Sequence, residues 1–459
     1  MRRTAVVNVV GLTPDLLSRT RFLAGWASGG AMATIQPPLP AVTCTSQSTF
    51  LTGKTPSEHG VVGNGWYFRD EAEVRFWRQS GRLVQAPRIW ERLRELDPSA
   101  TTANLFWWHA MYGGTDLTVT PRPMYPADGR KIPDVHTHPA GLRDELQDEL
   151  GRFPLFHFWG PRTSIRSSEW IAAAARMVEE RAQPTLSLVY LPHLDYALQR
   201  HGPEDPRVEE DVREIDRVCE ELVGHLEARG VRVVILSEYG ITPVERPVSL
   251  NRILREEGFL AVREELGREL LDAGASRAFA VADHQLAHVY LNDPDAEPEV
   301  RALLEAVPGV EAVLRGETRR TAGLDHPRAG DLVAIGERDA WFTYYYWLDD
   351  GRAPDFAPTV DIHRKPGYDP AELFIDPEIR FPRARAVRRL LQKKLGFRYL
   401  MDLIPLDGSL VRGSHGRLPE RDADAPLLLT REAHLLPEER LEATGVYDVL
   451  LRHLTDGAR

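Results

Sequence analysis

Hydroxyl side chains crowd around one cysteine in the stretch PAVTCTSQSTFLTGKTPSEHG, residues 40–60. Proline precedes this run, and Gly, Pro and His-Gly follow it, so we expect a loop, then a helix beginning near Thr43, then a tight turn. Each hydroxyl is a potential nucleophile once a base or a metal activates it. Cys44 adjoins Thr43, but a small packing residue is a better interpretation of it than a reactive thiol.

Polar and acidic residues also stand where predicted strands end. Asn8 and Gly11 belong to the end of the first strand, Asp195 follows a strand at 184–191, and Glu238 follows one at 231–237. Ligands of α/β proteins gather beyond the carboxyl ends of the strands. Any one of these residues could be a helix cap, but together they indicate a metal site or an anion site.

The elements that must position these residues alternate between strands and helices. Continuous apolar or β-branched runs at 4–10, 101–108, 184–191 and 231–237 are typical of parallel strands covered on both faces. Helical patterns lie between them, such as 209–230, which ends in Gly. The alternation predicts an α/β domain with a mostly parallel sheet.

A chain of 459 residues is long enough for one large domain plus a smaller one. Short strands mix with helices from about 245 to 335, which predicts an inserted cap subdomain within a core formed by 1–244 and 336–459. The aromatic segment 341–350 is expected to be core packing. The basic amphipathic segment 381–397 is expected to be a solvated surface helix rather than a membrane or partner helix.

Composition limits the partners. The 57 basic and 68 acidic residues give a net charge of -11, which argues against binding of a nucleic-acid duplex. Two cysteines cannot form a disulfide framework and favour a reducing compartment. No apolar segment is long enough to cross a bilayer, so we expect a cytoplasmic protein with no membrane contact. The sequence leaves the oligomeric state open.

The stretch TCTSQSTFLTGKTPSEHGVVGN resembles the signature of the alkaline phosphatase superfamily, in its nucleotide pyrophosphatase/phosphodiesterase branch. Phosphonoacetate hydrolase is also similar. The shared elements are a Thr, then Thr-Gly, then Pro-x-x-His-Gly, then an Asn, and the resemblance continues in DYALQRHGP, LSEYG and GSHGRLPERDADAPLLL. It implies a three-layer α/β sandwich with a mostly parallel central sheet and a smaller inserted α+β cap.

The resemblance implies a nucleophilic mechanism at Thr43. Thr43 would attack phosphorus and form a covalent phospho-threonine, which water then cleaves. Asn64 matches the family residue that helps to bind a phosphoryl oxygen, and we also predict that Trp66 contacts the substrate, a small phosphorylated molecule. The family uses two zinc ions to activate the nucleophile and to stabilise the attacking or leaving oxygen.

Several positions depart from the family pattern. Val10-Gly11 replaces Asp-Gly after the first strand, and the nearest oxygen ligand is Asn8, two residues earlier on the same strand face. Gln199 replaces the His of Asp-x-x-x-His, and Glu238-Tyr239 replaces Asp-His.

The metal-ligand set implied by the resemblance is therefore altered. It consists of Asn8, Asp195, Gln199, Glu238 and Tyr239, with His415 as the first choice for a further ligand and His363 as the second. Amide and phenol oxygens suit zinc less well than imidazole and carboxylate, so Mn or Mg becomes plausible beside the expected Zn.

Three functions are compatible with this pattern. The first is a metal-dependent hydrolase of a phosphodiester, diphosphate or phosphonate that works through a phospho-Thr43 intermediate. The second is a non-catalytic relative that binds a phosphorylated metabolite or a protein. The third is a transferase that moves a phosphoryl group to an alcohol. His284 and His288 have the i, i+4 spacing of a helical metal pair, but AHVYLND predicts a strand, which favours structural roles.

Overall fold

The computed structural model describes residues 1–127 and 130–457, and its centre is a nine-stranded sheet. The strands lie in the order β21-β2-β20-β9-β1-β8-β5-β6-β7. Their bounds are β21 (Arg440–Glu442), β2 (Ala31–Gln36), β20 (Leu427–Thr430), β9 (Arg232–Leu236), β1 (Thr4–Val9), β8 (Leu186–Leu191), β5 (Thr102–Leu105), β6 (Leu117–Pro121) and β7 (Val135–His138).

The central strands run parallel. β1 pairs with β8 on one side and with β9 on the other, and β5 continues the parallel set through β8 and β6. Every residue of β1 is buried, as its continuous apolar run predicts. Two strands run against the others, β20 between β9 and β2, and β7 at one edge, whereas β2 and β21 run in the direction of the central strands. The predicted α/β class with a mostly parallel sheet is confirmed.

One predicted strand is too long. The run 101–108 was expected to be extended throughout, but β5 ends at Leu105. Phe106 has a φ of 71°, in the left-handed region, so the strand cannot continue through it. Leu105 and Phe106 are both buried, which explains why an apolar pattern extends past the end of the strand.

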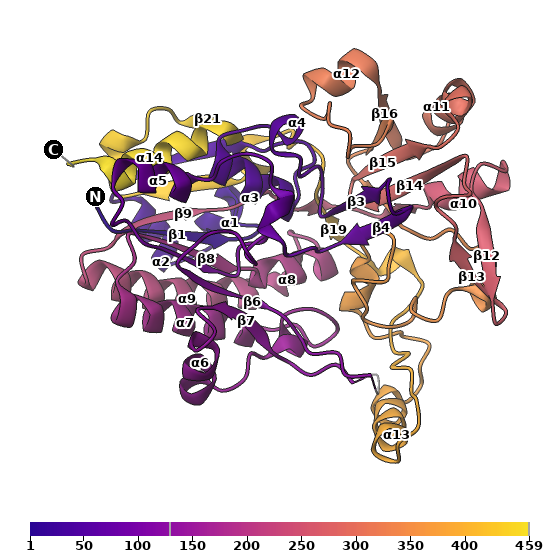
Figure 1. The fold of residues 1–459 in the computed structure, drawn as a ribbon, viewed down its shortest axis with the longest axis horizontal. Helices are drawn as coiled ribbons and strands as arrows, with labels where there is room; N and C mark the ends of the chain where they lie inside the picture. Colours follow the sequence, from indigo (N-terminus) through magenta and orange to yellow (C-terminus); the bar gives the residue numbers. More distant parts are fainter. Residues whose placement is uncertain (128–129, 458–459) are drawn as a thin grey trace.

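Helices cover both faces of the sheet and complete a three-layer sandwich (Figure 1). One layer contains α7 (Arg166–Ala182) and α9 (Val208–Ala228), with α6 (Leu142–Leu150) beside them. The other contains α3 (Thr43–Thr52), α5 (Ile89–Leu96) and α14 (Val446–Thr455). α9 ends as its sequence predicts, because Gly230 follows the cap with a φ of 73°.

A second lobe surrounds a four-stranded antiparallel sheet. It has the order β14-β15-β17-β16, with bounds β14 (Ala278–Asp283), β15 (Leu286–Leu291), β17 (Leu332–Gly336) and β16 (Val310–Leu314). Its core also contains Trp347 and the buried aromatic residues at 342–346, while Trp341 is buried in a smaller cluster with Val244 and Val411, so core packing is the correct interpretation of that segment. The hairpin of β3 (Gly65–Phe68) and β4 (Glu73–Phe76) also contributes residues to this core. The boundaries of the cap at 245 and 335 stay a prediction.

The remaining elements are short, except for α13 (Pro382–Lys394), which projects from the body at the lower right of Figure 1. The other helices are α1 (Pro14–Ser18), α2 (Phe22–Ala27), α4 (Pro56–His59), α8 (His193–His201), α10 (Leu250–Glu256), α11 (Glu297–Glu305) and α12 (Gly316–Thr321). Short strand pairs are β10 (Thr242–Pro243) with β19 (Gly413–Ser414), β11 (Arg246–Val248) with β18 (Ala340–Phe342), and β12 (Val262–Glu265) with β13 (Arg268–Leu271). In the described part of the chain, no helix combines the length and apolar character that a membrane span requires.

Candidate active site

The predicted site residues converge at the carboxyl ends of β1, β8 and β9. Asn8 is the penultimate residue of β1, Asp195 lies in the first turn of α8 after β8, and Glu238 follows β9. These three strands are neighbours in the sheet, so their ends meet at one edge. Thr43 reaches the same place as the first residue of α3.

Thr43, Tyr239 and Asp195 form a chain of hydrogen bonds with a fixed direction. The Tyr239 hydroxyl donates to Oδ1 of Asp195 at 3.1 Å, and Oγ1 of Thr43 lies 3.2 Å from the same hydroxyl. A phenol has a single hydrogen. When Asp195 is ionised, Tyr239 gives this hydrogen to Asp195, and Thr43 is then the donor to Tyr239. The hydrogen of the Thr43 hydroxyl therefore points along a path that ends at a carboxylate.

The other oxygen of Asp195 is held by two further side chains. Nε2 of Gln199 donates to Oδ2 of Asp195 at 2.7 Å, and the Tyr368 hydroxyl donates to Oε1 of Gln199 at 3.1 Å. Gln199 lies one helical turn after Asp195 on α8, so both side chains share one face. Burial raises the pKa of Asp195 to about 7, although its hydrogen bonds from Tyr239 and Gln199 oppose the shift.

Glu238 forms a second buried group with two amides. Its Oε1 accepts hydrogen bonds from Nδ2 of Asn8 and from Nε2 of Gln47. Burial raises the pKa of Glu238 to about 8, against the effect of these two donors. Two acceptor atoms, Oδ1 of Asn8 and Oε2 of Glu238, are buried without a hydrogen-bond partner.

His415, and not His363, lies at this site. Nε2 of His415 is 3.9 Å from Oδ1 of Asp195, and its Nδ1 is 2.7 Å from the carbonyl oxygen of Ala41. The imidazole stacks on the Tyr239 ring with 3.5 Å between centroids, and burial lowers its pKa to about 3. The ring is therefore neutral at physiological pH. His363 is exposed in the turn at 361–364, and no described contact joins it to Asp195.

Asn64 is fixed beside the start of α3. Its Oδ1 accepts a hydrogen bond from the Cys44 N–H at 3.0 Å, and its Nδ2 donates to Oδ1 of Asp283 at 3.0 Å. The Asn64 N–H donates to Oδ2 of the same carboxylate at 2.7 Å. Trp66, which we expected at the substrate, is buried in the second core, with its ring stacked on Phe68.

The second lobe closes the site. The turn between β14 and β15 carries His284, whose ring lies 3.6 Å from that of His415 and 3.7 Å from that of Tyr368, measured between centroids. The Gln285 N–H donates to the His415 carbonyl oxygen at 2.8 Å. A hollow of about 20 Å³ lies next to Tyr239 and His415, which is room for about one water molecule.

The family of the chain follows from comparison with known proteins. The model of the family described as type I phosphodiesterase/nucleotide pyrophosphatase matches residues 4–369. The chain belongs to this family. An uncharacterized pyrophosphatase/phosphodiesterase of Schizosaccharomyces pombe is 24% identical over 248 residues, which are 53% of this chain and 43% of the yeast protein. The chain thus spans less than half the length of that relative.

Two solved structures share the fold. Murine ectonucleotide pyrophosphatase/phosphodiesterase 5, as an inactive variant in complex with AMP, is 14% identical with a TM-score of 0.60, covering 99% of this chain and 95% of that one. Phosphonoacetate hydrolase from Sinorhizobium meliloti, in complex with phosphonoformate, is 17% identical with a TM-score of 0.63, covering 99% and 96%. The alkaline-phosphatase-like fold predicted for the chain is confirmed.

The residues present do not fit the two zinc ions implied by the family. Both carboxylate oxygens of Asp195 already accept hydrogen bonds, and Tyr239 stands stacked against His415. Gln199 and Asn8 offer neutral oxygens, which zinc disfavours. The unpaired oxygens of Asn8 and Glu238 are instead the hard ligands that Mg²⁺ or Mn²⁺ accepts.

Another group in the described residues does have metal-ligand spacing. Nε2 of His193 lies 3.1 Å from Asp211 and 3.2 Å from Glu214, at the junction of α8 and α9. This group is separate from the predicted ligands. Although burial opposes the shift, hydrogen bonding to Asp211 and Glu214 raises the pKa of His193, so the three side chains can form an ion-pair group without a metal.

Three residues of the site were missed by sequence reasoning, and one of them is Tyr368, which donates to Gln199. Gln47 lies one turn after Thr43 on α3, so the i, i+4 spacing could have placed it beside the nucleophile. Asp283 comes from the second lobe, and its only signal is an acidic residue at the end of the AFAVAD strand. Both are buried and hydrogen-bonded to residues that we did predict, Glu238 and Asn64.

Proposed function

We propose that this protein hydrolyses a small phosphodiester, diphosphate or phosphonate, with Thr43 as the nucleophile. The observation that carries the proposal is the directed hydrogen-bond chain from Thr43 through Tyr239 to Asp195. Family membership supplies the reaction class, because the members are described as phosphodiesterases and nucleotide pyrophosphatases. The free, buried thiols of Cys44 and Cys219 support our proposal of a reducing, cytoplasmic location.

The hydrogen bonds from Thr43 through Tyr239 to Asp195 provide a path for proton transfer in both half-reactions. As Oγ of Thr43 forms its bond to phosphorus, its proton passes to the Tyr239 oxygen and the Tyr239 proton passes to Asp195. The bond from phosphorus to the leaving group breaks, and that group departs as an anion that takes a proton from solvent. In the second half, water attacks phosphorus, its hydroxyl stays on phosphorus and its other proton passes to solvent. The bond from Oγ of Thr43 to phosphorus breaks, and Oγ takes back the proton from Asp195 through Tyr239. A phosphodiester then releases a phosphate monoester, and a phosphonate releases phosphate.

The start of α3 and Asn64 would hold the phosphoryl oxygens. Thr43 is the first helical residue, so the positive end of the helix dipole favours an anion beside it, although the Cys44 N–H is already bound to Oδ1 of Asn64. Asn64 carries two amide hydrogens and gives one of them to Asp283. The second remains for a phosphoryl oxygen beside Thr43, which makes Asp283 a residue that positions Asn64.

A divalent cation would lie between Asn8 and Glu238. The two buried oxygens without partners, Oδ1 of Asn8 and Oε2 of Glu238, are the atoms that would hold it. Their chemistry favours Mn or Mg over Zn. When bound, such an ion supplies positive charge that stabilises the anionic phosphoryl group.

One observation favours a second candidate, a non-catalytic relative that binds a phosphorylated ligand. Thr43 is only 3% exposed, and the hollow next to Tyr239 and His415 has space for about one water. The turn between β14 and β15 lies against His415 through the His284 ring and the Gln285 N–H. A buried Thr43 suits a protein that binds a phosphorylated ligand without forming a phospho-threonine.

Turnover of an aryl phosphodiester such as bis(p-nitrophenyl) phosphate tests the proposal in Mn²⁺ and in Mg²⁺. Thr43→Ala should abolish hydrolysis, whereas Thr43→Ser should keep part of it and accumulate a serine that carries a p-nitrophenyl phosphoryl group, detectable by mass spectrometry. Thr52→Ala is the matched control, because Thr52 is a buried threonine at the far end of α3. Equal turnover in wild type and Thr43→Ala would overturn the role of Thr43. Phosphate appearing on an added alcohol would identify a transferase.

A further inference from the structure

Helix α13 exposes its apolar face. Val387, Leu391 and Leu395 follow one another at helical spacing and are 54%, 54% and 72% exposed. No residue of the helix is buried. Surface helices normally turn such a stripe toward the core, because exposed apolar area is costly in water.

The opposite face of α13 is the one that contacts the rest of the protein. Arg385 and Arg389 both bind the carboxylate of Asp402, in the segment that returns from the helix to the body. Lys393 lies over the Tyr399 ring at 5.5 Å. The basic side chains of α13 therefore contact the returning segment of the chain, and its apolar side chains point away from that segment. Its orientation is the reverse of a helix whose apolar face packs on the core.

The same segment is strongly positive. Eight basic residues lie between 380 and 398, and no Asp or Glu occurs from 379 to 401, in a chain with a net charge of -11. They are Arg380, Arg383, Arg385, Arg388, Arg389, Lys393, Lys394 and Arg398. Three of them, Arg383, Arg388 and Lys394, are exposed on both sides of the apolar stripe. Phe381 and Phe397 flank the helix and are 64% and 66% exposed.

We propose that α13 lies in the surface of a membrane that contains anionic lipids. An interfacial helix buries its apolar stripe among the acyl chains, while the flanking Lys and Arg reach the lipid phosphates. The distribution of exposed apolar and basic side chains on α13 matches this requirement. A second copy of the chain fits less well, because pairing through this face would bring two clusters of eight cations together.

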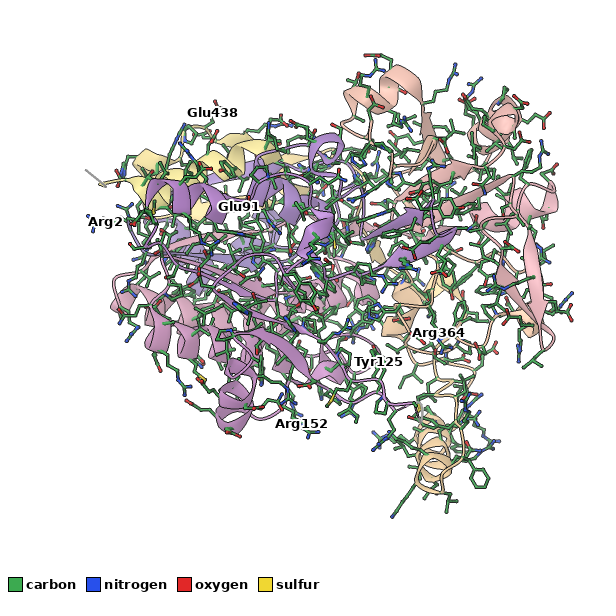
Figure 2. The ribbon with its side chains drawn as sticks, in the orientation of Figure 1. Arg2, Glu91, Tyr125, Arg152, Arg364 and Glu438 are labelled. Carbon is green, nitrogen blue, oxygen red and sulfur yellow. The ribbon has the colours of Figure 1, made fainter. Side chains whose placement is uncertain are left out.

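The position of α13 allows such contact without disturbing the fold. The helix is about 20 Å long and stands apart from both lobes in Figure 1. In Figure 2 its side chains extend into open space, and the labelled Arg364 lies toward the body end of this projection. A flat surface could therefore reach the outward face of α13 before it reached the lobes.

Co-sedimentation of the full chain with vesicles tests the proposal. We expect at least about tenfold tighter binding to vesicles of phosphatidylcholine mixed with phosphatidylglycerol than to phosphatidylcholine alone, and weaker binding as salt rises. The triple variant Val387→Ser, Leu391→Ser, Leu395→Ser should lose binding to both. The triple Arg383→Gln, Arg388→Gln, Lys394→Gln should lose the preference for the anionic lipid.

A matched control replaces exposed apolar residues elsewhere, at Met32, Leu96 and Leu266, with Ser. It should bind vesicles as the wild type does, and circular dichroism should show that all variants stay folded. The proposal is overturned if the wild type does not bind anionic vesicles, or if the α13 serine variant binds them as tightly. The proposal is also overturned if light scattering shows that the wild type is a dimer, that the α13 serine variant is a monomer, and that neither binds vesicles. The apolar face of α13 would then be covered by a second copy of the chain.

Discussion

The hydroxyl of Tyr239 lies between Thr43 and Asp195, 3.2 Å from Oγ1 of the first and 3.1 Å from Oδ1 of the second. Its geometry predicts that Tyr239→Phe removes the proton path but keeps the ring that stacks on His415. We expect kcat/KM for an aryl phosphodiester to fall by about 10²–10⁴-fold, the usual contribution of general acid–base catalysis.

Tyr290→Phe is the matched control for that variant, since Tyr290 is also fully buried and its hydroxyl donates to the Arg328 carbonyl oxygen at 2.8 Å. Each variant should lose on the order of 1–3 kcal/mol of stability, because a buried polar group loses its partner. Only Tyr239→Phe should lose activity. If both variants keep wild-type kcat/KM, the path through Tyr239 has no part in catalysis.

Asp283 should make stability depend on pH. Burial raises its pKa from 3.8 to about 7, so the folded protein keeps the carboxyl protonated where the unfolded chain has lost the proton. The free energy of unfolding should therefore be greatest below about pH 4 for this group and fall as pH rises to about 7. The slope from one group is at most about 1.4 kcal/mol per pH unit.

Urea denaturation between pH 4 and 8 measures this slope, and Asp283→Asn should reduce it. Asp195 and Glu238 have raised pKa values as well and contribute slopes of the same sign, so part of the dependence should remain in the variant. A stability that rises with pH over this range, or an identical slope in Asp283→Asn, would contradict the assignment.

Lys365 is the cation of a buried charge cluster beside the Tyr344 ring. It is 2% exposed, and its Nζ contacts the carboxylates of Asp369 and Glu372, which are buried as well. Lys365→Met should destabilise the protein by about 3–5 kcal/mol, because two carboxylates lose their counterion. Lys54→Met, which removes an exposed partner of Glu58, should change stability by less than about 1 kcal/mol. Thermal or urea denaturation of the two variants decides this comparison.

Sequence reasoning located the strand-end residues because parallel strands place their carboxyl ends together. Asn8, Asp195 and Glu238 could be predicted in this way, and a helix start at Thr43 follows from the Pro-rich loop before it. Asp283 could not, since nothing local in the sequence shows that the β14–β15 turn folds back on Asn64. That contact depends on how two lobes meet.

The interpretation of α13 shows a different limit. Periodicity correctly predicts an amphipathic helix on the surface, which the structure places at Pro382–Lys394. It does not show which face is covered. The contacts of Arg385 and Arg389 with Asp402 decide that question, and they turn Val387 and Leu391 outward. Burial, rather than pattern, therefore distinguishes a surface helix from a docking helix.

Metal content gives the sharpest check on the altered ligand set. Because Gln199 and Tyr239 stand where the family has histidines, we expect purified protein to lose zinc on dialysis against EDTA. Added Mn²⁺ or Mg²⁺ should then raise the melting temperature, by a stabilisation of about 2.7 kcal/mol at 100 times Kd.

Glu238→Gln should remove this effect, since it removes the charge beside the unpaired oxygen of Asn8. His193→Ala should leave it intact, because His193 belongs to the separate group with Asp211 and Glu214. Elemental analysis that finds two zinc ions per chain after dialysis would show that Asp195, His415 and their neighbours rearrange to a zinc site.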